Sequence, residues 1–372
     1  MRHYKYIHFL WHDELKFNTR LVRMINNKEY GFSLDDHLFV TPHKMIYEAL
    51  RNYRNVILFD SKKQTYTQVI NLYASFGDWL FFHSILSWGS IFKVKKKYYK
   101  KIIWRTWGHD ATFAKVNEGS LLKRLKNRIF NFFKLRVVRL FFAVGVSSNY
   151  IDALDIKMRY GNVKTVHVSY PEKTKDIIVS NSQKKDILNI MVGHSGYPAD
   201  NHIEVMEKLK KYKNENICIY LIFSYANTSY MKEIVDYVNT NWSQKVVVVT
   251  KFMPLNEYKE FCSRMDIGIF DFDKPQSYAI GNVSLLFSLR KKLFFNRKGL
   301  WHKAFSEKGA PHCCTDELDN MSFEQFRSPL IFEEEKYEGL DKKTFEENLE
   351  SWKLLLKKLD YITREGWGLS QK

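Results

Sequence analysis

The second half of the chain alternates between short apolar runs and longer amphipathic runs. The apolar runs cover residues 186–193, 217–225, 245–252, 266–272 and 292–296. The runs between them place apolar residues three or four positions apart, as at Ile203, Met206 and Leu209, which is the spacing of a helix with one buried face. Continuous apolar strands separated by helices are typical of a parallel sheet covered on both faces. The pattern therefore predicts a doubly wound α/β domain that closes with the strand at 292–296.

The first half is less regular but contains the same kinds of run. Its strand-like segments lie at residues 4–11, 37–41, 55–60, 78–85, 101–108 and 141–147. Helical segments fit between them, so this half is also predicted to be α/β. The polar stretch 170–186 is the best candidate for a linker, and after Phe332 a charged segment places Trp352, Leu355 and Leu359 at helical spacing. We therefore expect a first domain at 1–170, a second domain at 186–331 and a C-terminal helical segment at 332–372.

Length and composition exclude several classes of protein. The 372 residues are enough for two hydrophobic cores, and a hydrophobic content of 45% is typical of a globular chain. The N-terminus has neither the apolar run nor the cleavage site of a secretory signal, and the apolar stretch 140–146 is far shorter than the roughly 20 residues of a spanning helix. The four cysteines show no CxxC spacing, so we expect buried free thiols and neither disulfides nor a zinc site. We expect a cytoplasmic protein without a cofactor.

Positive charge is concentrated in one segment. Of the net charge of +18, most comes from residues 93–139, which contain fifteen Lys and Arg residues and two acidic residues. These cations alternate with large apolar side chains, including Leu121, Leu125 and Phe133. The segment can be a solvated face, a nucleic-acid groove or a helix lying on an anionic membrane surface. Because no nucleic-acid-binding signature accompanies the charges, we favour the membrane surface and expect no nucleic-acid partner. The cations predicted to face it are Lys95, Lys96, Lys97, Lys123, Arg124, Lys126 and Arg128.

Two loops of the second half follow predicted strands and precede predicted helices. In an open parallel sheet, ligands bind beyond the carboxyl ends of the strands. Glycines allow close approach of the backbone, and the free N–H groups of a helix N-terminus attract phosphate. Tight turns need glycines as well, so the pattern leaves a structural and a diphosphate-binding interpretation open. The candidate donor-binding residues of these loops are Gly193, Ser195, Gly196, Asn201, Gly281 and Asn282. Neither GxGxxG nor GxxxxGK[ST] occurs there, so neither a dinucleotide nor ATP is indicated.

Acid–base candidates lie in the first half. Asp110 follows the strand-like run 101–108, where it can act as a general base for an acceptor hydroxyl or cap the next helix. His83 ends another strand-like run, a position where a satisfied core histidine is common. Asp271 and Asp273 form a DFD sequence at a strand end, but we assign no metal site to them.

Several separated motifs together resemble the bacterial 4-alpha-L-fucosyltransferase family. They are FFH at 81–83, WxxWGxD at 104–110, VGxSG at 192–196, YxxxxxxxDxGxF at 258–270 and QxxxIG at 276–281. The resemblance implies a GT-B glycosyltransferase with two Rossmann-like domains that face each other across a cleft, the acceptor side first and the nucleotide-sugar side second. It also implies that His83 and Asp110 belong to the acceptor side, and that Gln276 joins the glycine loops on the donor side.

This family takes a sugar from a nucleotide diphosphate and adds it to a polyprenyl-diphosphate-linked glycan. We therefore expect a peripheral enzyme at the cytoplasmic face of the bacterial inner membrane, with Asp110 as the first candidate base and His83 as the second. The donor expected from the resemblance is TDP-Fuc4NAc. Two alternatives stay open: a transferase of the same fold that uses another donor for capsule, lipooligosaccharide or wall glycan, and a non-catalytic basic protein that binds polyanions.

Overall fold

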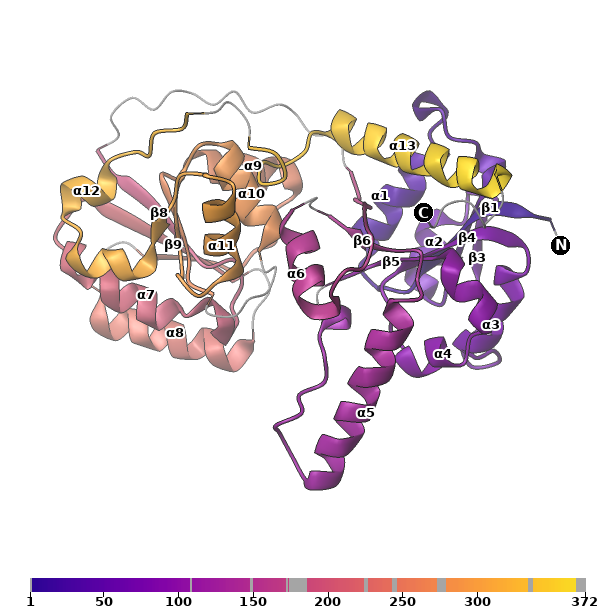
Figure 1. Ribbon diagram of the computed structural model, residues 1–372. Helices are drawn as coiled ribbons and strands as arrows, with labels where there is room; N and C mark the ends of the chain where they lie inside the picture. The colour runs from indigo at the N-terminus through magenta and orange to yellow at the C-terminus, as the bar shows by residue number, and fades with distance from the viewer. Residues whose placement is uncertain are drawn as a thin grey trace. The chain divides into compact units, whose positions relative to one another are not determined.

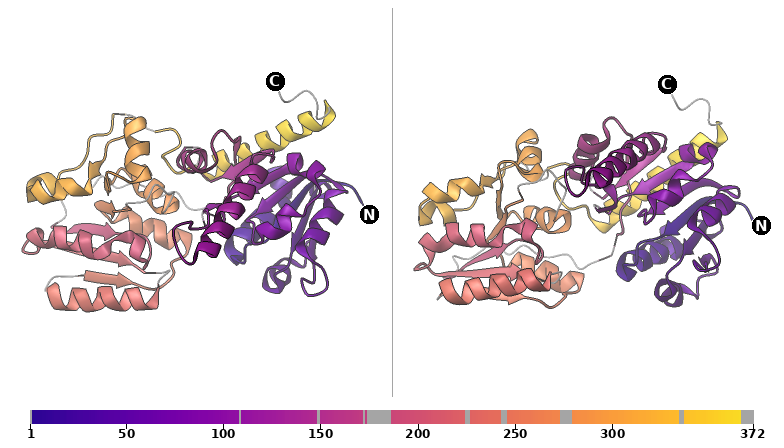
Figure 2. Two further views of the ribbon diagram at one scale, coloured as in Figure 1. Left: turned by 60° about the horizontal axis from the view of Figure 1, so that its bottom comes forward. Right: turned by 90° about the horizontal axis from the view of Figure 1, so that it is seen from below.

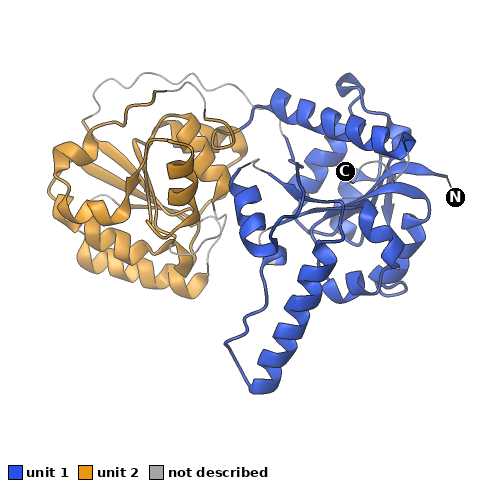
Figure 3. Cartoon of the chain, in the orientation of Figure 1, with its two compact units in different colours: residues 1–173, 343–372 blue, residues 174–342 orange. Residues whose placement is uncertain are grey.

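The computed structural model of the chain contains two compact units (Figures 1 and 3). The structure describes residues 2–107, 109–147, 150–171, 173, 186–223, 227–242, 246–272, 279–333 and 337–365. Unit 1 comprises residues 1–173 and 343–372, and unit 2 comprises residues 174–342. Most of the predicted linker, residues 174–185, lies outside the described residues.

Unit 1 is built on a seven-stranded parallel sheet with the strand order β3-β2-β1-β4-β5-β6-β7. Its strands are β1 (Tyr4–Leu10), β2 (His37–Thr41), β3 (Val56–Leu58), β4 (Gly77–His83), β5 (Ile102–Arg105), β6 (Ala143–Val146) and β7 (Thr165–His167). Its helices are α1 (Leu15–Asn26), α2 (Lys44–Leu50), α3 (Tyr66–Ala74), α4 (Trp88–Phe92), α5 (Leu121–Val138), α6 (Ile151–Tyr160) and α13 (Phe345–Arg364). The structure confirms six predicted strands and adds β7, which is too short to stand out in the sequence.

The alternation of side chains along the strands divides the core of unit 1 into two layers. Ile7 and Phe9 of β1 face the layer that α3, α4, α5 and α6 cover, whereas Tyr6 and Leu10 face the layer that α1, α2 and α13 cover. Helix α13 belongs to this unit although it follows unit 2 in the chain. Its Trp352 Nε1 donates to the carbonyl of Ser169 at 3.0 Å, and its Thr363 Oγ1 accepts from Nε1 of Trp79 at 2.9 Å.

The C-terminal helix begins at Phe345, later than the charged sequence after Phe332 predicts. A capping box explains this start, because the Thr344 side chain accepts from the backbone N–H of Glu347 and the Glu347 side chain accepts from that of Thr344.

Unit 2 is a six-stranded parallel sheet with the order β10-β9-β8-β11-β12-β13. Its strands are β8 (Leu188–Val192), β9 (Ile217–Ile222), β10 (Val246–Val249), β11 (Ile267–Phe270), β12 (Lys292–Phe295) and β13 (Cys313–Cys314). Its helices are α7 (His202–Leu209), α8 (Thr228–Asn241), α9 (Leu255–Ser263), α10 (Ile280–Ser288), α11 (Leu300–Glu307) and α12 (Phe323–Arg327), and they lie on both faces of the sheet (Figure 2). The prediction that the strand at 292–296 closes the series is wrong: β13 pairs with β12, and at two residues it is too short to be recognised.

Both sheets have the Rossmann strand order. The first three strands are added toward one edge of the sheet, and the fourth returns to pair with the first strand, after which strands are added toward the other edge. In unit 1 the reversal lies between β1 and β4, and in unit 2 it lies between β8 and β11. Beyond the carboxyl ends of these two strand pairs the following loops diverge, and ligands of doubly wound sheets bind there. The two reversal points therefore locate the candidate sites.

Candidate functional site

In unit 2, the loop after β8 depends on a glycine at its first position. Gly193 has a φ of +68°, and a Cβ there would lie 2.5 Å from Nε2 of His202 and 3.1 Å from Oδ1 of Asp200. Both the backbone conformation and the space thus require glycine. The predicted Gly193 and Ser195 follow the reversal-point strand β8 directly, which is where the sequence places them.

A buried carboxylate organises this loop. Asp200 accepts from the backbone N–H of His194 at 3.0 Å and from Oγ of Ser195 at 2.7 Å, and its Oδ1 lies 2.8 Å from Nδ1 of His194. Burial alone would raise the pKa of Asp200, but the hydrogen bonds from His194 and Ser195 outweigh it and hold the pKa below its usual value. The hydroxyl hydrogen of Ser195 is therefore directed at Asp200. Asp200 was not predicted as a site residue, although its place just before a helix signals a loop-forming role.

A second carboxylate joins the β8 loop to the ends of the neighbouring strands. Asp271, directly after β11, accepts from Nδ2 of Asn296 at 3.1 Å and from Oγ1 of Thr315 at 2.5 Å. Its carbonyl accepts from Nδ2 of Asn201 at 2.7 Å, and Asn201 itself has a φ of +50°. Asn201 and Asp271 thus fix the shape of this edge. Asp273, the other member of the DFD sequence, lies outside the described residues.

The N-terminus of α10 lies after the same reversal-point strand, β11. Gly281 is the second residue of the helix and is exposed. Among the described residues, and apart from its chain neighbours and its own helix backbone, no heavy atom lies within 4 Å of the position that a Cβ would take. Asn282 is half-buried, and its backbone N–H donates to the carbonyl of Ala279 at 2.9 Å. Ala279 has a φ of +57° and makes no side-chain cap. Gln276, predicted to join this site, lies outside the described residues.

In unit 1, three buried histidines form a chain across neighbouring strands. His8 Nε2 lies 3.0 Å from Nδ1 of His37, His8 Nδ1 lies 3.1 Å from Nε2 of His83, and His83 Nδ1 lies 2.7 Å from the hydroxyl of Tyr170. Burial lowers the pKa of His37 and of His83 to about 3 and places that of His8 well below its usual value. All three rings are therefore neutral at physiological pH. His83, a predicted catalytic residue, lies inside this chain at the end of β4, with a ring nitrogen on each side engaged.

Aromatic rings and an unpaired polar atom lie at the carboxyl edge of the unit 1 sheet. The ring of Trp107 stacks on His12 with centroids 4.0 Å apart and on Tyr170 at 5.4 Å. Ser84, directly after β4, has a φ of +77°, which is rare for a serine and costs backbone energy. Within the described part of the chain, Oγ of Ser84 is buried without a hydrogen-bond partner. Nε1 of Trp107 is also buried, and it interacts with the hydroxyl of Tyr170. Buried polar atoms in proteins are usually paired, so this edge has capacity for a polar ligand.

Asp110 lies behind this edge rather than on it. It is 5% exposed, and its Oδ2 accepts from the backbone N–H of Ile85 at 3.1 Å and from Nε1 of Trp104 at 3.0 Å. Its Oδ1 accepts from the backbone N–H of Trp107 at 2.7 Å. The carbonyl of the same residue accepts from the buried Nζ of Lys134, and burial lowers the pKa of Lys134 to about 7. In this structure the carboxylate connects β4, β5 and the loop that holds Trp107, and its predicted role as a base stays a prediction.

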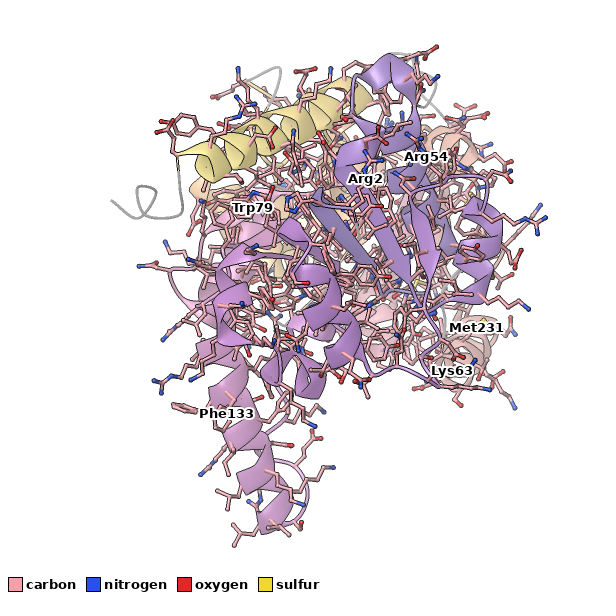
Figure 4. All side chains as sticks on the ribbon, turned by 90° about the vertical axis from the view of Figure 1, so that its right-hand side faces the viewer. Arg2, Arg54, Lys63, Trp79, Phe133 and Met231 are labelled. Atoms are coloured by element: carbon pink, nitrogen blue, oxygen red, sulfur yellow. The ribbon has the colours of Figure 1, made fainter. Side chains whose placement is uncertain are left out.

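Helix α5 carries much of the basic segment and projects from the rest of unit 1 (Figures 1 and 4). Its apolar side chains Leu121, Leu122, Leu125, Ile129, Phe132 and Phe133 are 49–78% exposed. Their spacing of three and four residues puts them on one side, opposite the buried Lys134 and Val138. The seven cations predicted to face a membrane are all exposed. Among the described residues, no helix is both long enough and apolar enough to span a bilayer.

The comparisons with known proteins agree with this architecture. A family model described as 4-alpha-L-fucosyltransferase, glycosyl transferase group 56, matches residues 4–356. The crystal structure of HepE from Anabaena in complex with UDP and glucose is similar, with a TM-score of 0.59 and 9% identity over 96% of this chain and all of that one. A glycosyltransferase from Rickettsia africae matches with a TM-score of 0.59 and 13% identity over the whole of both chains. An α,α-trehalose 6-phosphate synthase from Burkholderia multivorans matches with a TM-score of 0.54 and 10% identity over all of this chain and 99% of that one. These likenesses show the GT-B fold, two Rossmann-like domains in one chain.

Proposed function

Because this chain belongs to the 4-alpha-L-fucosyltransferase family, glycosyl transferase group 56, we propose that it transfers a fucose-type sugar from a nucleotide diphosphate to a lipid-linked glycan. The family establishes that the chain is a glycosyltransferase of the GT-B fold. The donor we propose is TDP-Fuc4NAc, and the place of reaction is the cytoplasmic face of the bacterial inner membrane.

We propose that the donor diphosphate binds at the carboxyl edge of the unit 2 sheet. This proposal rests on two segments that follow the strands at one reversal point and whose glycines let a ligand approach the backbone. They are the Gly193 loop after β8 and the N-terminus of α10 after β11. Helix N-termini attract phosphate, and glycines let it approach the backbone. The similar HepE structure holds UDP, which supports a nucleoside diphosphate as the ligand class. In this proposal Gly193, Gly196, Gly281 and Asn282 contact the donor, whereas Ser195 and Asn201 hold the loop in shape.

We propose that the acceptor binds at the carboxyl edge of the unit 1 sheet. The hydroxyl of Ser84 is buried and unpaired in the described part of the chain, so a glycan hydroxyl can donate to it or accept from it. The buried indole N–H of Trp107 can donate to a second glycan oxygen. In the transfer, the bond between the sugar and the diphosphate breaks, the acceptor oxygen bonds to the sugar, and the acceptor hydroxyl gives up its proton. Asp110 is the first candidate to take this proton and His83 the second.

The exposed stripe of α5 is the proposed membrane contact. A helix with apolar side chains on its outer side and flanking cations can lie in the interface of an anionic leaflet. Leu125, Ile129 and Phe133 form the centre of that stripe, and Lys126 and Arg128 flank it. A lipid-linked acceptor would be reached from this position without any spanning helix.

The proposed donor site is tested by a substitution that places a bulky side chain in it without disturbing the fold. Gly281→Trp places an indole at an exposed position with no neighbour within 4 Å, so the apo protein should melt at the wild-type temperature. We expect one of TDP, UDP, GDP and CMP to raise the melting temperature of the wild type by mass action, and Gly281→Trp to abolish that rise.

Gly89→Trp is the matched control for this experiment. Gly89 is also exposed, is also the second residue of its helix, and also has no neighbour within 4 Å, but it lies in unit 1. This variant should respond to the nucleotide as the wild type does. An unchanged nucleotide response in Gly281→Trp would reject the α10 site, and no response of the wild type to any of the four nucleotides would reject the donor class.

A further inference from the structure

Two histidines and a cysteine converge in unit 2 outside the proposed donor contacts. His302 is the third residue of α11, His312 precedes β13, and Cys314 ends β13. Nδ1 of His302 lies 2.9 Å from Nε2 of His312 and 3.4 Å from Sγ of Cys314. All three atoms lie within 4.8 Å of one another. A zinc site was not predicted because the sequence has no CxxC. The spacing His-x9-His-x-Cys brings these groups together only once β12, α11 and β13 have packed.

Nδ1 of His312, the ring nitrogen that faces away from the cluster, makes the kind of hydrogen bond to a carbonyl that metal-binding histidines usually make. Nδ1 of His312 lies 2.9 Å from the carbonyl of Ala310, and only a protonated Nδ1 can donate to that carbonyl. The lone pair of neutral His312 is therefore on Nε2, which faces the cluster. Ligating histidines in metal sites typically hold their ring orientation in this way, by donating the other N–H to a carbonyl or carboxylate.

Hydrogen bonding among the three atoms alone leaves the cluster poorly satisfied. Nδ1 of His302 must donate its single hydrogen to Nε2 of His312, since Nε2 carries none. Sγ of Cys314, 3.4 Å away, can share that hydrogen only as a weak acceptor. Three soft and borderline donor atoms thus point at one centre with only a weak hydrogen bond to the sulfur, and a cation would instead accept a lone pair from each.

The spacing of the donor atoms fits a tetrahedral ion. With Zn–N of about 2.05 Å and Zn–S of about 2.3 Å, tetrahedral ligands lie about 3.4 Å apart for two nitrogens and about 3.6 Å apart for nitrogen and sulfur. The observed 3.4 Å between Nδ1 of His302 and Sγ of Cys314 is close to this. The observed 2.9 Å between the nitrogens is shorter, and a slight turn of the His302 ring would open it.

From this geometry we propose that His302 Nδ1, His312 Nε2 and Cys314 Sγ bind a Zn²⁺ ion. Imidazole and thiolate ligands select zinc among the common divalent ions, and on binding the thiol releases its proton to solvent. Asp316 is already held by Arg297, with Nε and Nη2 at 2.8 and 3.1 Å from its carboxylate oxygens. Glu317 forms a second group with Cys314 and Asp316 within 4.8 Å, and its contact with Arg297 is longer, at 3.4 Å. Glu317 or a water molecule completes the four ligands.

A bound ion would stabilise the carboxyl edge of the unit 2 sheet by connecting two of its elements. It joins α11 to β13, and the residue after Cys314, Thr315, donates to Asp271 at the reversal point. Both histidines are half-buried, so an ion can enter from solvent. The proposal does not depend on the transferase proposal, because it rests on groups to which no donor contact is assigned.

The test is metal binding by the whole chain. After removal of metal with a chelator, the wild type should take up one equivalent of added Zn²⁺, measured by mass spectrometry of the metal, and its melting temperature should rise. Cys314→Ser and His312→Ala should lose both effects. Cys313→Ser is the matched control, since Cys313 is the neighbouring buried thiol and is not a member of the cluster, and it should bind zinc as the wild type does.

Cobalt gives a second measurement that needs no variant. Co²⁺ added to the metal-free wild type should produce the visible bands of tetrahedral cobalt and the charge-transfer band of a thiolate ligand. Zinc uptake by the wild type no greater than that of Cys314→Ser would overturn the proposal, as would cobalt spectra without the thiolate band. Neither result would bear on nucleotide binding, which the Gly281→Trp experiment measures separately.

Discussion

At the scale of single residues, Asp110 makes the clearest prediction. Asn at this position keeps one acceptor oxygen but turns the other into an NH₂ group that faces an N–H donor, from Trp107 or from Trp104 and Ile85. Hydrogen bonds to a charged group contribute about 1.5–3 kcal/mol each. Asp110→Asn should therefore lower the free energy of unfolding of unit 1 by about 2 kcal/mol, measured by urea denaturation.

The same variant separates the two roles of Asp110. If the carboxylate is also the base, turnover by protein that is still fully folded should fall by about 10²–10⁴-fold. Turnover close to that of the wild type would reject the base and leave a residue that positions Trp107. Asp60→Asn is the control, because Asp60 is a half-exposed carboxylate of the same unit, and its unfolding free energy should stay within about 0.5 kcal/mol of the wild type.

The sequence predicted where candidate residues lie along the strands and loops better than it predicted which residues they contact. Gly193 and Ser195 were found because they follow an apolar run, and strand ends are visible in a pattern. Asp200 and the cluster of His302, His312 and Cys314 were missed because their meaning arises from partners that only folding brings near. Asp110 was noticed, but burial and three N–H donors are properties of the packed protein that no spacing reveals.

At the scale of elements, strands that lie in an apolar run of the sequence were predictable, and two short strands were not. The run of β9 is continuous and apolar because both faces of a parallel sheet are covered, and even the three-residue strand β3 lies in such a run. Strands β7 and β13, with three and two residues, carry too little pattern to stand out. The late start of α13 depends on the capping box at Thr344, a local signal that the charged sequence before it obscured.

Helix α5 gives the prediction that belongs to this scale. Leu125, Ile129 and Phe133 are about half exposed, so changing all three to Ser should leave the fold intact. Burial of a large apolar side chain contributes about 1.5–3 kcal/mol when complete. At half of that for each, the three residues contribute about 2.3–4.5 kcal/mol, so the triple variant should bind anionic vesicles roughly fiftyfold to two-thousandfold more weakly in a sedimentation assay.

Two further variants test whether vesicle binding depends on the α5 stripe and on its cations. Leu354 and Tyr361 on α13 are also exposed apolar residues of unit 1, and changing both to Ser should leave vesicle binding unchanged. Changing Lys123, Arg124, Lys126 and Arg128 to Gln should weaken the preference for anionic over neutral lipid, since each cation near the surface contributes about 1 kcal/mol and, of the predicted membrane-facing cations, only Lys95, Lys96 and Lys97 would remain. Equal binding of the wild type to both lipids, or tighter binding to DNA than to either, would contradict the membrane assignment.

At the scale of the whole molecule, titratable groups divide unequally between the units. In the described part of the chain, histidines with a lowered pKa number four in unit 1 and two in unit 2. Those of unit 1 are His8, His37, His83 and His167, and those of unit 2 are His202 and His312. Burial is the main cause in each case, because a charged imidazolium is unfavourable away from water. Unit 1 therefore holds the larger set of histidines that must stay neutral for it to remain folded.

The larger number of buried neutral histidines in unit 1 predicts that unit 1 unfolds before unit 2 as the pH falls. An unfolded histidine binds a proton below about pH 6.5, whereas His37 and His83 bind one only near pH 3, and His167 near pH 4. Between these values the unfolded state holds more protons, so stability falls as the pH falls from about 6.5 toward 4. Each such histidine contributes up to about 1.4 kcal/mol per pH unit. Hydrogen exchange followed by mass spectrometry at pH 7 and pH 5 should show protection lost in the strands of unit 1 before those of unit 2.

His167→Gln isolates the contribution of one group to this effect. His167 Nε2 lies 2.8 Å from Oδ1 of Asn348, a bond that a glutamine amide can also make, and glutamine does not titrate. The pH dependence of unit 1 stability between pH 6.5 and 4.5 should therefore weaken by close to one proton in the variant. Loss of protection in unit 2 before unit 1, or an unchanged slope in His167→Gln, would show that carboxylates rather than buried histidines control the acid response.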